Sequence, residues 1–182
     1  VSRCQIINLN KIPNDLIKKA LIDKGFSNEL ANKASLESNG SYNKAFSFAK
    51  GKESDSVFEK WFQSWVRSAF KVKKNKEAVL ELVEWSKTVS KSGRETQKKF
   101  IAYSLEVFRQ ALLLNYGISE LTFYSPSTDF NFDSFSKFIG GANVEEISLE
   151  LENAYIQIQS NGNPNMIFTD LSLKLTRLIH KN

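Results

Sequence analysis

Four lysines stand within six residues near the middle of the chain: Lys71, Lys73, Lys74 and Lys76. Ammonium groups at such spacing can bind the phosphates of a nucleic-acid backbone as point charges. Phe70 precedes them, but no arginine or further aromatic residue is interleaved at a distance suited to contacting bases. We therefore treat the four lysines as candidate DNA-binding residues and a solvated loop as the favoured alternative.

Two acidic pairs could serve general acid/base catalysis, namely Glu145 with Glu146 and Asp129 with Asp133. Both pairs stand where a helix is expected to begin. Carboxylates there stabilise the positive end of the helix dipole, which explains the pairs without catalysis. We expect no hydrolytic or transfer site to assemble from these residues.

Cys4 is the only cysteine and His180 the only histidine. One cysteine excludes a disulfide framework or a multi-cysteine zinc site within the chain, and one histidine removes most remaining metal and triad chemistry. We expect no metal and no cofactor. Cys4 is interpreted as a small packed hydrophobic residue, and His180 as a residue near a helix C-terminus without a functional role.

The 182 residues are 41% hydrophobic and 25% charged, the composition of an ordinary globular chain of one domain, or one with a small appendage. Residues 1–100 carry 20 Lys/Arg against 11 Asp/Glu, whereas residues 101–182 carry 5 against 9. The basic front part is explained either by solvated lysines or by a surface that faces phosphates or neighbouring subunits. No apolar run is long enough to span a membrane and no signal-peptide pattern is present, so we expect a soluble cytoplasmic protein.

Glycine and proline fall almost entirely between segments of helical periodicity, which predicts an all-α chain. The first fifty residues predict a small bundle of three short helices. The predicted N-caps of the three helices are Asn14, Ser27 and Ser41. The helices are expected to end at Gly25, at Asn39 with Gly40, and at Gly51, respectively.

The polar, breaker-containing stretch 50–55 predicts the boundary to a second helical domain, residues 55–182, with about five to six helices. An aromatic stripe from Val57 to Phe70 opens it, and we interpret this stripe as core, with an interface anchor as the alternative. The longest periodic segment, 94–116, has two apolar stripes and is expected to be the buried centre. The other predicted elements are a helix at 77–90, a loop at 122–133, a short helix through Phe135 to Ile139, a helix begun by an Asn143–Glu146 capping box, and a last helix from Pro164.

Three segments carry a family resemblance. Val1-Ser2-Arg3-Cys4-Gln5 resembles the segment that closes the ATPase core of bacterial DNA polymerase III clamp-loader subunits, and Gly40-Ser41-Tyr42-Asn43-Lys44-Ala45 resembles the Gly-Ser-x-Arg-Asp-Ala stretch of the third helix of their lid domain. The tail from Asn161 through Leu173 resembles the Asn-Pro-containing end of the delta-prime class of these AAA+ subunits. The resemblance spans the whole chain and implies a lid domain over residues 1–50 and an oligomerising collar domain over residues 55–182.

The resemblance implies roles for two residues. Arg3 would act in trans as an arginine finger on ATP bound to the neighbouring subunit. At Asn43 the ATP-hydrolysing members have an arginine that contacts nucleotide, and a short uncharged amide cannot replace a guanidinium there. The chain therefore resembles the non-ATPase delta-prime class rather than the gamma/tau ATPases.

No Gly-x-x-x-x-Gly-Lys-Ser/Thr loop occurs in the chain, so we expect no enzyme in this segment and a nucleotide-binding core located before Val1. The partners that the resemblance implies are the gamma/tau and delta subunits of a hetero-pentamer, with the sliding clamp and primed DNA contacted through that complex. Two alternatives stay open. One is an autonomous basic helical nucleic-acid-binding module, and the other is a gamma/tau-type subunit with an atypical lid.

Overall fold

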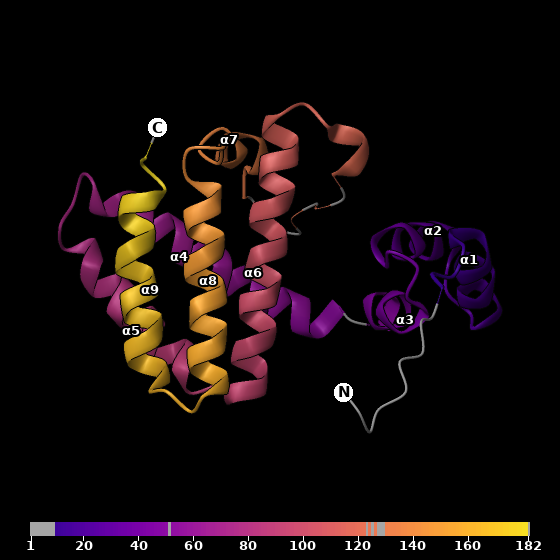
Figure 1. Cartoon of the computed structure of the whole chain (residues 1–182), viewed down its shortest axis with the longest axis horizontal. Helices are drawn as coiled ribbons and strands as arrows, with labels where there is room; N and C mark the ends of the chain where they lie inside the picture. The colour runs from indigo at the N-terminus through magenta and orange to yellow at the C-terminus, as the bar shows by residue number, and fades with distance from the viewer. Residues whose placement is uncertain (1–9, 51, 123, 125, 127–129, 182) are drawn as a thin grey trace, which may run out of the picture. The chain divides into compact units, whose positions relative to one another are not determined.

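The computed structural model describes residues 10–50, 52–122, 124, 126 and 130–181. Within these residues every regular element is a helix, which confirms the predicted all-α fold. The chain divides into two compact units, Val1–Asp55 and Ser56–Asn182. Each unit has its own hydrophobic core, and helices α1 to α3 make up the first (Figure 1).

The first unit is a bundle of α1 (Asn14–Asp23), α2 (Asn28–Glu37) and α3 (Tyr42–Lys50). Each helix packs against the other two. Four alanines in the core let these short helices approach closely. The buried core residues are Ile17, Leu21, Ala31, Ala34, Ala45 and Ala49. Phe46 adds aromatic contacts to Phe26 and Tyr42, each with ring centroids 5.9 Å apart.

Two of the three predicted N-caps of this unit are confirmed. The Oγ of Ser27 and that of Ser41 each accept a hydrogen bond from the backbone N–H three residues on, at 3.3 Å and 3.4 Å. The prediction for Asn14 is wrong. Asn14 is the first helical residue, and Pro13 occupies the N-cap without a side-chain acceptor.

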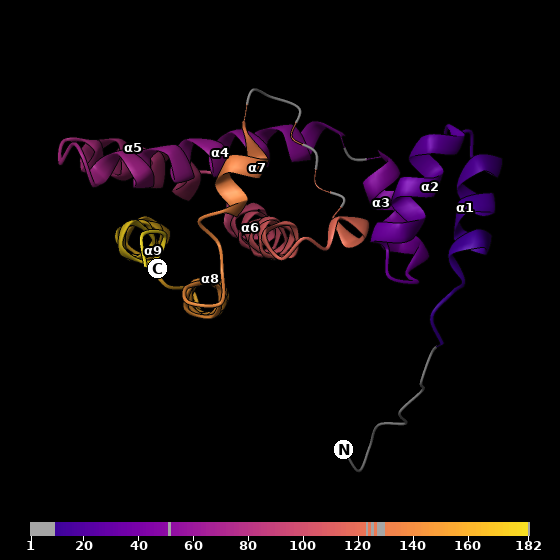
Figure 2. The same cartoon turned by 90° about the horizontal axis from the view of Figure 1, so that it is seen from above.

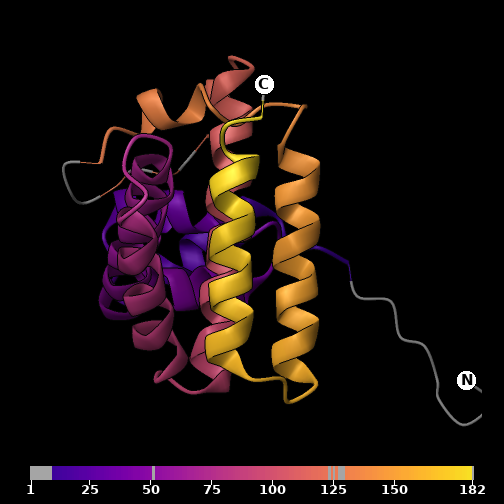
Figure 3. The same ribbon diagram turned by 90° about the vertical axis from the view of Figure 1, so that its left-hand side faces the viewer.

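The second unit contains six α-helices and one short 3-10 helix in the part of the chain that the structure describes. These are α4 (Lys52–Val72), α5 (Ala78–Ser90), α6 (Arg94–Asn115), η1 (Ser119–Leu121), α7 (Phe132–Ser136), α8 (Val144–Gln159) and α9 (Pro164–Leu178). Residues 52–55, within the stretch where we placed an irregular boundary, are helical. Seen from above, α4 and α5 form one layer, α6 and α9 lie against it, and α8 is farthest from it (Figure 2). Figure 3 shows α8 and α9 side by side, joined by a short turn.

Aromatic side chains fill the core of the second unit. Phe62, Trp65, Phe100 and Phe108 have at most 1% of their surface exposed, and Trp65 stacks on Trp85 with centroids 5.1 Å apart. The stripe along α4 is therefore mainly core, as interpreted from the sequence, although Val57 at its start is exposed. Phe100, on α6, contacts rings from α4, α5 and α9, which gives α6 the predicted central position.

Two local predictions for the second unit are wrong. α7 begins at Phe132, inside the predicted loop, because the Asn131 side chain caps it by accepting a hydrogen bond from a backbone N–H at 2.8 Å. Asn143 caps no backbone N–H of α8, so the capping box is absent. In the last helix, α9, Met166 has 69% of its surface exposed. The predicted start of this helix at Pro164 is confirmed.

Candidate functional site

The solvent-exposed positions in the second half of α4 carry cations and a hydroxyl group. From residue 58 to residue 72 the exposed side chains are Lys60, Ser64, Arg67 and Lys71. Their spacing of i, i+4, i+7 and i+11 places them on one face of the helix. The opposite face packs into the aromatic core, which fixes the rotation of α4 about its axis. These four residues are called the α4 face below.

The α4 face borders an open groove with a volume of about 270 Å³. Three further residues line this groove: Gln63, Ser68 and Glu81. Glu81 comes from α5, so the groove follows the line where α4 and α5 lie together. Its lining is polar, with three cations, three neutral residues and one carboxylate.

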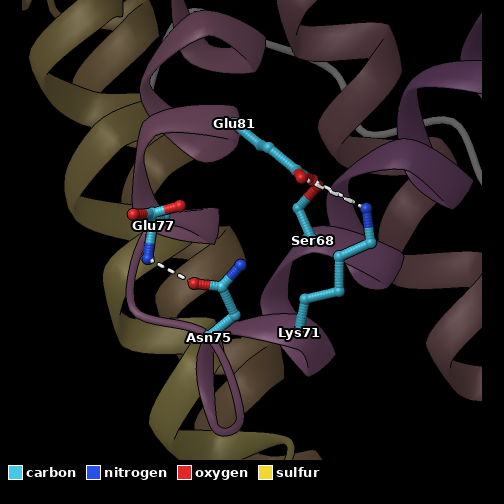
Figure 4. Close-up of polar contacts among 5 residues, drawn as sticks. All are labelled: Ser68, Lys71, Asn75, Glu77 and Glu81. Atoms are coloured by element: carbon cyan, nitrogen blue, oxygen red, sulfur yellow. Dashed lines mark hydrogen bonds and ion pairs between the residues drawn. The ribbon is translucent and has the colours of Figure 1, made fainter.

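Ser68, Lys71 and Glu81 form a hydrogen-bonded cluster in the groove (Figure 4). The Ser68 hydroxyl donates to Glu81 Oε2 at 2.7 Å, and Lys71 Nζ lies 3.1 Å and 3.2 Å from the two carboxylate oxygens. The hydrogen bond from Ser68, followed by that from Lys71, lowers the pKa of the Glu81 carboxyl below its ordinary value. Glu81 is therefore ionised at neutral pH and orients the ammonium group of Lys71.

This cluster is unsuited to nucleophilic catalysis by Ser68. A general base works best when its pKa lies near the operating pH, and the pKa of Glu81 is shifted away from neutrality. The groove lining instead offers three cations, Lys60, Arg67 and Lys71, and the Ser64 hydroxyl, which are groups suited to binding an anion.

The turn between α4 and α5 continues the basic surface. The backbone carbonyl of Lys71 accepts hydrogen bonds from the N–H groups of Lys74 and Asn75, at 2.9 Å and 2.8 Å, which closes the turn. Asn75 Oδ1 in turn accepts from the N–H of Glu77 at 2.9 Å (Figure 4). The exposed lysines of this turn are Lys73, Lys74 and Lys76. Of the four lysines predicted from the sequence, Lys71 thus lies on the α4 face, and Lys73, Lys74 and Lys76 lie in the turn that follows α4.

Sequence reasoning missed Lys60 and Arg67 as members of this surface. The signal was present, because both residues occupy the same helical face as Lys71. The aromatic residues between them have the same helical periodicity, so the segment was interpreted by its core face alone. The guanidinium of Arg67 lies 5.9 Å from the centroid of the Phe130 ring, a cation–π contact that helps to position it.

Arg3 and Cys4, to which the family resemblance gave an arginine-finger and a packing role, lie outside the described residues, as does Asp129. Asn43 is exposed on α3. Gly40 shows why its motif begins with glycine: its φ is +81°, and an added Cβ would lie 2.5 Å from the Cβ of Lys11. That requirement is a local packing constraint.

The described carboxylates of the acidic pairs lie at helix starts. Glu145 and Glu146 are in the first turn of α8, and Asp133 is in the first turn of α7. Glu146 also forms an ion pair with Lys181. These placements match the helix-dipole interpretation. No group of three or more His, Cys, Asp or Glu residues suited to a metal ion occurs in the part of the chain that the structure describes.

His180 directly follows the C-terminal end of α9, near a helix C-terminus as expected from the sequence. Its ring packs edge-on against Phe70 with centroids 5.3 Å apart. Burial, followed by the nearby positive charge of Lys73, lowers the pKa of His180 below its ordinary value. The imidazole is therefore neutral at pH 7 and acts as a packing group between the C-terminal end and α4.

A second surface lies on α8 and α9, where large apolar side chains are exposed seven residues apart. These are Leu149 and Ile156 on α8 and Met166 and Leu173 on α9, with exposed fractions from 42% to 69%. Between the two helices Lys174 bridges Glu150 and Asp170, each at 2.8 Å. The four apolar residues are called the α8–α9 apolar surface below.

No family model matches the chain, and searches of curated proteins and of solved structures find no match. Among the described residues, no helix combines the length and apolar character that crossing a membrane requires.

Proposed function

We propose that the chain is a delta-prime-like, non-ATPase subunit of a bacterial clamp loader, which helps to load the sliding clamp onto primed DNA in the cytoplasm. In this proposal the first unit is an AAA+ lid domain and the second is the collar through which the subunits assemble into a hetero-pentamer. Arg3 acts in trans as an arginine finger on ATP bound to a neighbouring gamma/tau subunit, which is the chain's part in the chemistry.

The proposal rests on the order of the segments along the chain. A Ser-Arg-Cys segment is followed by a three-helix unit whose third helix begins after Gly40-Ser41, and then by a larger helical unit. Asn43, at the position that resembles a nucleotide-contacting arginine, is exposed and uncharged. This favours the delta-prime class over the gamma/tau-type alternative.

The α8–α9 apolar surface gives the proposed collar a means of assembly. Exposed Leu, Ile and Met side chains at regular helical spacing are typical of surfaces that become buried against another helix. α8 lies in the outer layer of the unit, so its exposed face is open to a partner (Figure 2). We propose that this surface contacts the collar of a neighbouring subunit.

A pull-down experiment tests the assembly surface. Immobilised gamma/tau and delta subunits are expected to retain the full chain, and the Leu149→Ser/Ile156→Ser variant is expected to bind at least tenfold more weakly. Both residues are more than half exposed, so the variant should keep its fold. Leu80→Ser is the matched control, because Leu80 is a 68% exposed apolar residue on α5.

Equal loss of binding in the control would overturn the assignment of the surface. Failure of the unmodified chain to bind either subunit would overturn the proposed function itself. Circular dichroism of all three proteins would establish that any loss of binding is not a loss of folding.

A further inference from the structure

The α4 face presents a line of positive charge of defined length. Lys60 and Lys71 are eleven residues apart, which at 1.5 Å per residue corresponds to about 17 Å along the helix. Residues 60–76 contain six Lys/Arg and no Asp/Glu. The cations on α4 and those of the α4–α5 turn therefore form one continuous basic strip.

One carboxylate, that of Glu81, lines the groove beside this strip. Its charge is opposed by Lys71 at 3.1 Å, and its Oε2 also accepts the Ser68 hydroxyl. Three cations and this one carboxylate line the groove, so the lining residues together carry a net positive charge. Ser64 and Gln63 supply neutral polar groups between these cations.

The composition of the α4 face distinguishes among its potential ligands. A protein interface has an apolar centre, and a helix that binds a membrane surface has apolar residues beside its basic ones. The four residues of the α4 face are all polar or charged, and the nearest exposed apolar residue on this side of α4 is Val57, three residues before Lys60. Several cations and a hydroxyl group are side chains of the kind that contact phosphate and sugar in nucleic-acid complexes.

We propose that the α4 face and the groove beside it bind the phosphate backbone of nucleic acid, without reading its sequence. Lys60, Arg67 and Lys71 pair with phosphates, Ser64 donates a hydrogen bond, and the lysines of the α4–α5 turn extend the contact. This goes beyond the proposed function, in which DNA is contacted through the complex. It gives the second unit a direct nucleic-acid contact of its own.

Fluorescence anisotropy with a labelled 20-nucleotide DNA, single-stranded and duplex, tests this proposal on the full chain. Binding is expected to weaken steeply as salt rises from 50 to 200 mM, because each phosphate contact releases counterions. Lys60→Gln/Arg67→Gln is expected to weaken duplex binding roughly tenfold and to reduce the salt slope by about 1.8, the value for two lost contacts.

Lys91→Gln/Lys99→Gln is the matched control, because it removes the same net charge from exposed positions outside the groove, one directly after α5 and one on α6. This control should bind as the unmodified chain does. Equal weakening in both double variants would show that only net charge matters and would overturn the assignment to the α4 face. Absence of DNA binding by the unmodified chain at 50 mM salt, or binding to anionic vesicles alone, would overturn it as well.

The two proposals fail separately. Binding to gamma/tau and delta without binding to DNA would retain the clamp-loader function and remove the α4 contact. Binding to DNA with the expected double-variant effect, but without binding to those subunits, would retain the α4 contact and favour an autonomous nucleic-acid-binding module.

Discussion

Replacing Phe100 with alanine should destabilise the second unit strongly. Phe100 is fully buried, and its ring lies between 5.6 Å and 6.3 Å from five other rings, measured between centroids. These rings come from three other helices, so collapse into the cavity would require several helices to move together. Phe→Ala in a core costs about 3–5 kcal/mol, and we expect the upper part of that range.

Urea unfolding followed by tryptophan fluorescence measures this loss. All three tryptophans, Trp61, Trp65 and Trp85, lie in the second unit, so the signal reports on that unit alone. The control is Phe138→Ala, because 46% of Phe138 is exposed and its loss should cost about 1 kcal/mol or less. A free energy of unfolding that falls by less than about 1.5 kcal/mol in Phe100→Ala, or equally in both variants, would refute the central position of Phe100.

Three further predictions concern single contacts. Ser27→Ala should lower the stability of the first unit by about 1 kcal/mol in thermal melts followed by circular dichroism, because the N-cap of α2 is lost. Asn143→Ala should lower the free energy of unfolding in urea by about 1–3 kcal/mol. The buried side-chain amide of Asn143 donates a hydrogen bond to the carbonyl of Phe138 at 2.7 Å and accepts one from the N–H of Gly140 at 3.1 Å. The pKa of His180 in the folded chain lies below 6.5, so the unfolded chain gains this proton first on acidification. The stability that depends on neutral His180 is therefore full above about pH 6.5 and is lost as pH falls toward the folded pKa, which NMR titration of the imidazole measures.

Each of these predictions has a contradicting result. An unchanged melting curve for Ser27→Ala would show that the cap is not needed. Equal stability of Asn143→Ala and the unmodified chain would show that water replaces the lost hydrogen bonds. A His180 pKa at or above 6.5, or an unchanged pH dependence in His180→Gln, would contradict the burial of a neutral imidazole.

Local signals in the sequence predicted much of the helical fold. Ser27 and Ser41 cap their helices as predicted, since a serine cap needs only the backbone of the next turn. Asn143 was misassigned because its side-chain amide bonds groups outside α8. Its Oδ1 accepts from the backbone N–H of Gly140 at 3.1 Å, and its Nδ2 donates to the carbonyls of Phe138 at 2.7 Å and Lys181 at 3.3 Å. A cap motif cannot indicate such competition. The packing of His180 could not be predicted from its neighbours in the sequence either, because its ring contacts Phe70, more than a hundred residues earlier.

The candidate site was predicted only in part. The lysine cluster is visible as consecutive letters, and three of its members do lie together in the α4–α5 turn. Lys60 and Arg67 lie on the same face as Lys71 only because the chain is helical there. Glu81, which orients Lys71, comes from another helix. The sequence contains the periodicity of the α4 face but not the packing of α5 beside it.

Size-exclusion chromatography with light scattering, on the chain mixed with gamma/tau and delta subunits at moderate salt, tests the proposed function most directly. The proposal predicts one species whose mass equals that of a hetero-oligomer containing this chain. Elution of every component at its own mass, with a chain shown by circular dichroism to be folded, would contradict it.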